Sequence, residues 1–234
     1  MIAAVAKAID QLARDKDLRA VLLKSLVLAL LVYVVLAALL FWVVGFIPET
    51  GWGWLDGLIE NAAFFVLIVV MALFFPALVT LFVGVFLDDA ARAVERFHYG
   101  ADPPGREPDL WPSLMSTLKF TGVIIFLNLL ILPVHILVIF FPLLNLFILY
   151  GLNGYLFGRE YFELVARRHL AEADVKAMRR KYRSRVWLTG AGIAFALTIP
   201  IVNLATPVVA TAAMVHIFKR LAAKSGAGPA TAAP

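Results

Sequence analysis

The sequence contains no cysteine and few charged residues, and each scarcity excludes a class of protein. Without cysteine there is no disulfide framework, no thiolate nucleophile and no cysteine-ligated metal site. Charged residues make up only 16% of the chain, and no HExxH, GxSxG or phosphate-loop string occurs among them. The four histidines share no helical ligand spacing: His98, His135, His169 and His216. We therefore expect no enzymatic activity, no cofactor and no bound metal.

Apolar residues are what the chain has in excess. Hydrophobic side chains make up 62% of the sequence, and the mean hydropathy is +0.90. One soluble domain of this size could not bury so much apolar surface, which predicts an all-α integral membrane protein with one domain over residues 1–221. The basic residues border apolar stretches, so the net charge of +5 favours anionic lipid headgroups over nucleic acid as partners.

Two segments are long and apolar enough to be transmembrane helices, residues 22–47 and 62–87. At 1.5 Å per residue each crosses the ~30 Å hydrocarbon core. Lysine and arginine are frequent before the first segment and absent from the connection 48–61. Because basic residues stay on the cytoplasmic side, we expect a multi-pass protein with both termini in the cytoplasm.

The remaining segments are assigned from charge and periodicity. Residues 1–16 predict an amphipathic helix, which lies either in the membrane interface or against the protein's own cytoplasmic parts. We expect a cytoplasmic helix extension and loop over 88–119, a basic cytoplasmic helix over 158–185 and a disordered tail over 222–234. Asp88 and Asp89 form an acidic pair, but no further carboxylate stands at a spacing that supports a metal site.

Two apolar stretches, 120–157 and 186–218, are each interrupted by the string Pro-x-x-Asn-Leu. The pieces are too short to cross the bilayer, so we expect two half-penetrating helical hairpins. Proline stops a helix and asparagine can cap the one that restarts, which places the hairpin tips at Pro142, Asn145, Pro200 and Asn203. Such tips either build an ion site, as the broken helices of transporters do, or serve only as turns.

An anion site is predicted at the start of the first transmembrane helix. The free amides of a helix N-terminus and an arginine fork together suit an oxyanion, which indicates the segment from Arg14 to Ala20. The alternative is that Arg19 and Lys24 only mark the cytoplasmic interface. His135, inside an apolar stretch, is a further candidate as a pore or relay group.

The hairpin tips and one polar string carry a resemblance to a known family. The string is Gly158-Arg159-Glu160-Tyr161-Phe162-Glu163, and it lies between the two hairpins. From Asp17 to Arg220 the chain resembles the CysZ-type sulfate permease and etoposide-induced protein superfamily. The resemblance implies a bacterial inner-membrane homo-oligomer with two transmembrane helices and two half-penetrating hairpins, which admits sulfate for cysteine biosynthesis.

The family's sulfate-binding pattern, a glycine-led turn with two basic residues, falls on Asp17, Leu18, Arg19 and Ala20. Here Asp17 stands where the pattern has glycine, and Ala20 stands where a second basic residue often occurs. A neighbouring carboxylate weakens anion binding, and one arginine offers half the contacts of two. We therefore expect a permease for sulfate or a related oxyanion. The alternative is a non-transporting scaffold that wedges one leaflet and binds anionic lipid.

Overall fold

Every element in the described part of the chain is a helix, which confirms the all-α class. The computed structural model describes residues 2–46, 50–107 and 141–226 and the isolated positions 111, 115, 126, 130 and 133, without the side chains of residues 2, 70–85, 142, 143 and 145. The helices are α1 (Ile2–Arg14), α2 (Lys16–Val44), α3 (Gly53–Val85), α4 (Leu87–Tyr99), α6 (Pro142–Arg167), α7 (Glu172–Lys181), α8 (Arg183–Leu197) and α9 (Pro200–Ser225).

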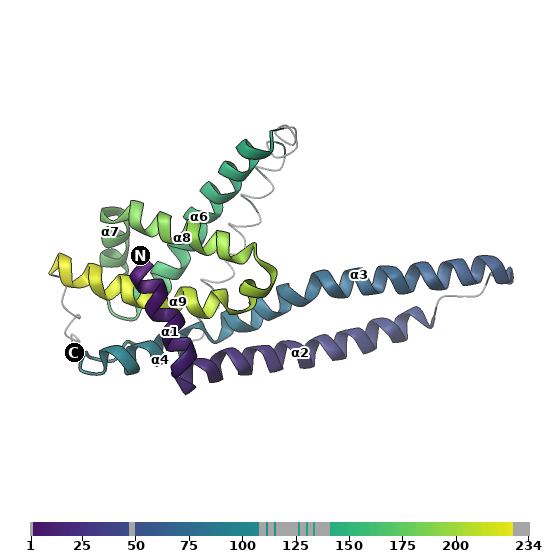
Figure 1. The fold of residues 1–234 in the computed structure, drawn as a ribbon, viewed down its shortest axis with the longest axis horizontal. Helices are drawn as coiled ribbons and strands as arrows, with labels where there is room; N and C mark the ends of the chain where they lie inside the picture. The colour runs from purple at the N-terminus through teal and green to yellow at the C-terminus, as the bar shows by residue number, and fades with distance from the viewer. Residues whose placement is uncertain are drawn as a thin grey trace.

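The helices α2 and α3 form a long antiparallel arm that projects from the group of shorter helices (Figure 1). By length and composition α2 and α9 can each cross a membrane, but 6% of the most apolar window of α2 is buried, compared with 67% of that of α9. Apolar side chains on the arm face outward, among them Val35 at 68% and Phe65 at 67% exposure. A surface of this kind is stable in lipid rather than in water. Both arm helices begin earlier than predicted, and Asp15 caps α2 by accepting from the Asp17 amide.

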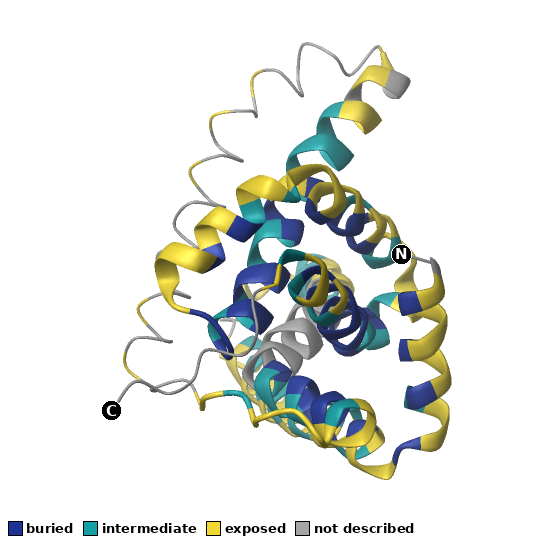
Figure 2. Ribbon diagram, turned by 90° about the vertical axis from the view of Figure 1, so that its left-hand side faces the viewer, coloured by how far each residue is buried: buried dark blue, intermediate teal, exposed yellow. Residues whose placement is uncertain are grey.

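The core is built around α9, which packs against α1, α4, α6 and α8. Its buried side chains run from Thr206 to Leu221, and the buried faces of the surrounding helices point inward (Figure 2). Pro207 lies inside α9 and has no amide hydrogen, so the carbonyl of Asn203 lacks its helical partner. Thr211 donates its hydroxyl to the Pro207 carbonyl at 2.9 Å. The central buried helix α9 therefore lacks one of its backbone hydrogen bonds.

The first helix packs on the protein itself, in agreement with one of the two alternatives drawn from the sequence. Ala4, Ala8 and Gln11 are buried, and α1 contacts α9. Val5 and Ile9 are exposed beside this contact. Small residues at the contact let the two helices approach closely, and the larger apolar residues are left outside; their placement in a membrane interface stays a prediction.

Glycines bring α6 and α8 into close contact. A Cβ at Gly190 would lie 2.6 Å from the Cα of Gly158 and would also meet the Gly154 carbonyl. Such small-residue packing is common where helices pair in membranes. Gly158 is therefore a packing position inside α6, which continues past residue 157, the predicted end of the first hairpin. The predicted basic helix 158–185 is likewise divided, into the end of α6, α7 and the start of α8.

The second predicted hairpin appears as α8, a turn at Thr198 and Ile199, and α9. Pro200 occupies the first helical position of α9, where a missing amide hydrogen costs nothing. Asn203 lies within the first turn and does not cap, because the cap residue is Ile199 and the Asn203 amide donates to its carbonyl at 2.8 Å. α9 continues to Ser225 and ends at Gly226 with φ of 66°, so residues 222–225 belong to the helix and not to a tail.

The first predicted hairpin can be followed only in its second half. α6 begins at Pro142, again with proline at the first position, which agrees with the predicted break. Its N-cap is Phe141, so Asn145 is one turn inside the helix rather than at its cap. Most of residues 108–140, including His135, and all of residues 227–234 lie outside the described residues.

Candidate functional site

A charged cleft of about 820 Å³ lies at the foot of the α2–α3 arm. Its walls are the first turns of α2, the length of α4, the loop 100–107 and the Lys219 side chain of α9. The ionisable residues in the walls are Asp17, Lys24, Asp89, Arg92, Glu95, Arg96, Asp102, Glu107 and Lys219. The cleft therefore combines both signs of charge at the point where the apolar arm begins.

Each acid in the cleft walls has a basic partner. Arg96 pairs with Asp17 at 3.3 Å, with both side chains more than 60% exposed. Lys219 pairs with Asp102 at 2.8 Å, and this bond ties the loop to α9. The remaining pairs are Arg92 with Asp89, Arg92 with Glu107, and Arg168 with Glu95. Exposed pairs of this kind are weak, so a competing anion can replace the carboxylate at Arg96.

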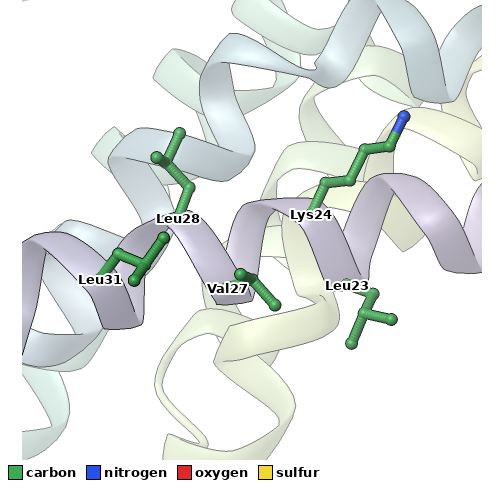
Figure 3. Close-up of a pocket in the computed structure, with 5 residues that line it drawn as sticks. All are labelled: Leu23, Lys24, Val27, Leu28 and Leu31. Carbon is green, nitrogen blue, oxygen red and sulfur yellow. The ribbon is translucent and has the colours of Figure 1, made fainter.

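Lys24 differs from the other cations of the cleft. Within the part of the chain that the structure describes, no carboxylate lies within ion-pair distance of its ammonium group. Lys24 also lines a second, shallow depression of about 300 Å³ whose other walls are Leu23, Val27, Leu28 and Leu31. In Figure 3 Lys24 extends from the same side of α2 as Leu28, away from Leu23 and Val27. It thus stands between the charged cleft and the apolar surface.

The four residues of the predicted anion site point in different directions, because successive residues of a helix are about 100° apart. Asp17 and Ala20 line the cleft, Leu18 is fully buried, and Arg19 is exposed outside the cleft walls. The helix N-terminus already has an acceptor: Asp15 binds the Asp17 amide through its side chain at 2.9 Å and the Arg19 amide through its carbonyl at 3.2 Å. The structure therefore does not bring these residues together around one point.

A buried ion cluster lies directly behind the cleft. Glu95 accepts from Arg168 at 2.8 and 3.1 Å, and its Oε1 lies 2.9 Å from His169 Nε2. All three residues are less than 9% exposed. Burial raises the pKa of Glu95, but the hydrogen bonds from His169 and Arg168 outweigh it and lower the pKa to about 2. The cluster holds α4 against the end of α6, and Arg168 also fixes the loop by accepting from the Arg106 amide at 2.8 Å.

The string Gly158 to Glu163 has a structural part in this arrangement. Glu163 is buried and lies 3.0 Å from Arg159, 2.8 Å from Arg167 and 3.1 Å from Arg179. Because Arg179 belongs to α7, Glu163 joins α7 to α6. Burial and the neighbouring Glu163 raise the pKa of Glu160, which is half-buried. These residues line neither the cleft nor the depression.

Sequence reasoning missed the partners that close the cleft. Asp102 and Lys219 are 117 residues apart, and Glu95 and Arg168 are 73 apart. Asp88 and Asp89, considered as a metal pair, lie beside Arg168 at 3.5 Å and Arg92 at 2.6 Å. The only available signal was the alternation of acids and bases over residues 88–107, which indicates pairing without naming the partners.

The comparison with protein families gives one match, to the family described as "Sulfate transporter CysZ/Etoposide-induced protein 2.4", over residues 4–207. No individually curated protein matches the sequence. The family is a transporter family, and its match covers the α2–α3 arm, α8 and the first turns of α9. The family match and the exposed apolar helices together identify the chain as a membrane protein. The chain belongs to the family of the sulfate transporter CysZ and etoposide-induced protein 2.4.

Proposed function

We propose that the chain lets sulfate or a related oxyanion cross the bacterial inner membrane and so supports sulfate assimilation into cysteine. The family description supports a sulfate-type substrate. The observation that carries the proposal in this chain is the position of Lys24, a cation without a carboxylate partner among the described residues, at the junction of the cleft and the apolar arm. In this proposal the ammonium group of Lys24 is the last charge that an anion contacts on its way from the cleft to the bilayer.

Lys24 and Arg96 act together in this proposal. Arg96 is held by Asp17 through one exposed contact of 3.3 Å, which an oxyanion with several oxygens can replace. Lys24 stands two turns further along α2, on the face shared with Asp17 and Ala20. At 4 Å the attraction between unit charges is about 4 kcal/mol at the effective dielectric of a protein surface, enough to offset part of the anion's hydration.

The orientation follows from the basic residues and remains part of the proposal. Lysines and arginines gather at the base of the α2–α3 arm and around α7, which supports a cytoplasmic location for this end and both termini. The far end of the arm carries Trp42, Trp52 and Trp54, all more than 60% exposed, as in an aromatic interface belt.

The proposal includes a homo-oligomer. In the second hairpin α8 reaches only about 21 Å from Arg183 to Leu197 at 1.5 Å per residue, less than the ~30 Å of the hydrocarbon core. Among the described helices the two of the arm and the longer α9 are too few to enclose a path through the bilayer, so we expect further copies to complete it. The exposed apolar faces of α2 and α3 leave room for contacts with further copies.

The test is radiolabelled sulfate uptake into proteoliposomes. Native protein is compared with Lys24→Gln, Arg19→Gln and empty vesicles, at matched reconstitution. The two variants lose the same charge from the same helix, five residues apart, but only Lys24 lines the cleft. We expect saturable uptake by native protein and Arg19→Gln, and at least about tenfold less by Lys24→Gln, which corresponds to about 1.4 kcal/mol.

Other results would change the proposal in distinct ways. Loss of uptake in Arg19→Gln alone would place the anion on the other face of α2. Equal uptake by all variants would exclude both residues. No uptake above empty vesicles, with native helicity by circular dichroism, would favour the leaflet-wedging scaffold that binds anionic lipid.

A further inference from the structure

Four exposed cations gather where α7 passes into α8. Arg180, Lys181, Arg183 and Arg185 lie within six residues, and all four are exposed. The ion pairs of this region involve other residues: Arg159, Arg167 and Arg179 with Glu163, and Arg167 and Lys176 with Glu172. Within the described residues the four cations therefore have no carboxylate partner. We refer to them as the α7–α8 basic edge.

An exposed apolar surface begins immediately beyond this edge. Trp187, Leu188 and Phe195 are 40%, 48% and 58% exposed, and Ile201 at the hairpin turn is 85% exposed. The opposite face of α8 is buried against α6, so the exposed face has no partner in the described chain. Exposed apolar side chains in this number mark a surface that contacts lipid or another protein.

Trp187 indicates how the edge would lie relative to a bilayer. Its indole Nε1 donates to the Gly151 carbonyl of α6 at 3.0 Å, which holds the ring at the start of the apolar face. Tryptophan prefers the headgroup region of a bilayer. The four cations precede it by two to seven positions and so lie at the height of the lipid phosphates. In Figure 1, α7 lies beside the start of α8, and the turn between α8 and α9 lies at the other end of α8.

We propose that the α7–α8 basic edge is a binding site for an anionic phospholipid, with its phosphate among the four cations and its acyl chains along the exposed face of α8. Charge complementarity selects the headgroup, and the adjoining apolar face selects a lipid over a soluble polyanion. A cation near an anionic membrane surface contributes about 1 kcal/mol, which is about fivefold in affinity. Two engaged cations therefore give roughly 25-fold preference over a zwitterionic lipid.

The test uses the full chain purified in mild detergent and titrated with phosphatidylglycerol or phosphatidylcholine, with bound lipid counted by native mass spectrometry. We expect native protein to prefer phosphatidylglycerol by at least about tenfold. Replacing all four cations of the edge by glutamine should remove this preference. The matched control replaces four other exposed cations by glutamine: Lys7, Lys16, Arg220 and Lys224. It loses the same net charge and should keep the preference.

Two results would overturn the proposal. Retained preference in the edge variant would exclude the site, and equal loss in the control variant would mean that net charge alone attracts the lipid. If the edge variant does not fold, raising the salt concentration tests native protein directly, because about 0.5 M salt should screen the phosphates and abolish the preference. Binding that salt does not weaken would refute a charge-selected site. None of these readings depends on sulfate uptake.

Discussion

Replacing Glu95 by glutamine should destabilise the protein more than removing the charge of an exposed carboxylate. The change takes the buried negative charge away from Arg168 and His169 and leaves a single amide oxygen to accept from them. Breaking a buried ion pair in this way costs about 3–5 kcal/mol. The pKa of Glu95 gives a similar figure, because a change from 4.5 to about 2 is about 2.5 pKa units, or about 3 kcal/mol.

Thermal unfolding in mild detergent, followed by circular dichroism, measures this effect. For a chain of this size about 1 kcal/mol shifts Tm by about 2–4 °C, so Glu95→Gln should lower Tm by at least about 6 °C. Glu172→Gln is the matched control. Glu172 also has two basic partners, Arg167 at 3.2 Å and Lys176 at 3.3 Å, but its side chain is 52% exposed. Exposed pairs contribute at most about 1 kcal/mol, so the control should stay within about 4 °C.

The pH dependence supplies an independent check. Because folding lowers the pKa of Glu95, its contribution is complete above the unfolded value of 4.5 and is lost as pH falls toward about 2. Native protein should therefore lose stability over this window, and Glu95→Gln should lose about 3 kcal/mol less. Equal Tm shifts in the two glutamine variants, or the same acid sensitivity in native protein and Glu95→Gln, would refute the assignment of a stabilising buried cluster.

Two further substitutions test the packing that supports the hairpin. Gly190→Ala should lower the free energy of unfolding by about 1–3 kcal/mol, because the added Cβ meets the backbone of Gly154 and Gly158. At Gly192 an added Cβ meets nothing within 4 Å, so Gly192→Ala should raise the free energy of unfolding by up to about 1 kcal/mol through helix propensity. Phe218→Ala should cost about 3–5 kcal/mol because this ring is 1% exposed and stacks on His169 at 5.4 Å, whereas Phe195→Ala, at 58% exposure, should be nearly neutral. Tm measurements in detergent check both pairs. A Gly192→Ala loss as large as that of Gly190→Ala, or a Phe195→Ala loss equal to that of Phe218→Ala, would contradict the packing described.

Local signals in the sequence predicted the helices and where some of them start. Proline at residues 142 and 200 fixes the starts of α6 and α9, because the ring removes one amide hydrogen and blocks the preceding turn. The change from uncharged to charged residues did not predict where this helix ends. The charge pattern separates residues 157 and 158, yet α6 continues to Arg167 and Gly158 packs inside it, because its missing side chain admits the backbone of α8.

The site depended on contacts that no local pattern contains. Charges over residues 88–107 indicate pairing, but the partners Arg168 and Lys219 come from α6 and α9, far along the chain. Helical geometry also separates neighbours: Arg19 and Ala20 are adjacent in sequence, yet only Ala20 faces the cleft. Lys24 shares that face because it stands seven residues after Asp17, about two turns.

Pro207 divides α9 into two mechanical units. The segment before it carries Ile201 and Val202 at the exposed hairpin turn, and the segment after it carries the buried residues up to Leu221. Bending at a missing hydrogen bond is less costly than bending an intact helix. A bend at Pro207 would move the exposed turn while the contacts of Phe218 with Phe162 and His169 stay intact. Pro207 thus separates the exposed start of α9 from the part of the helix that packs in the core.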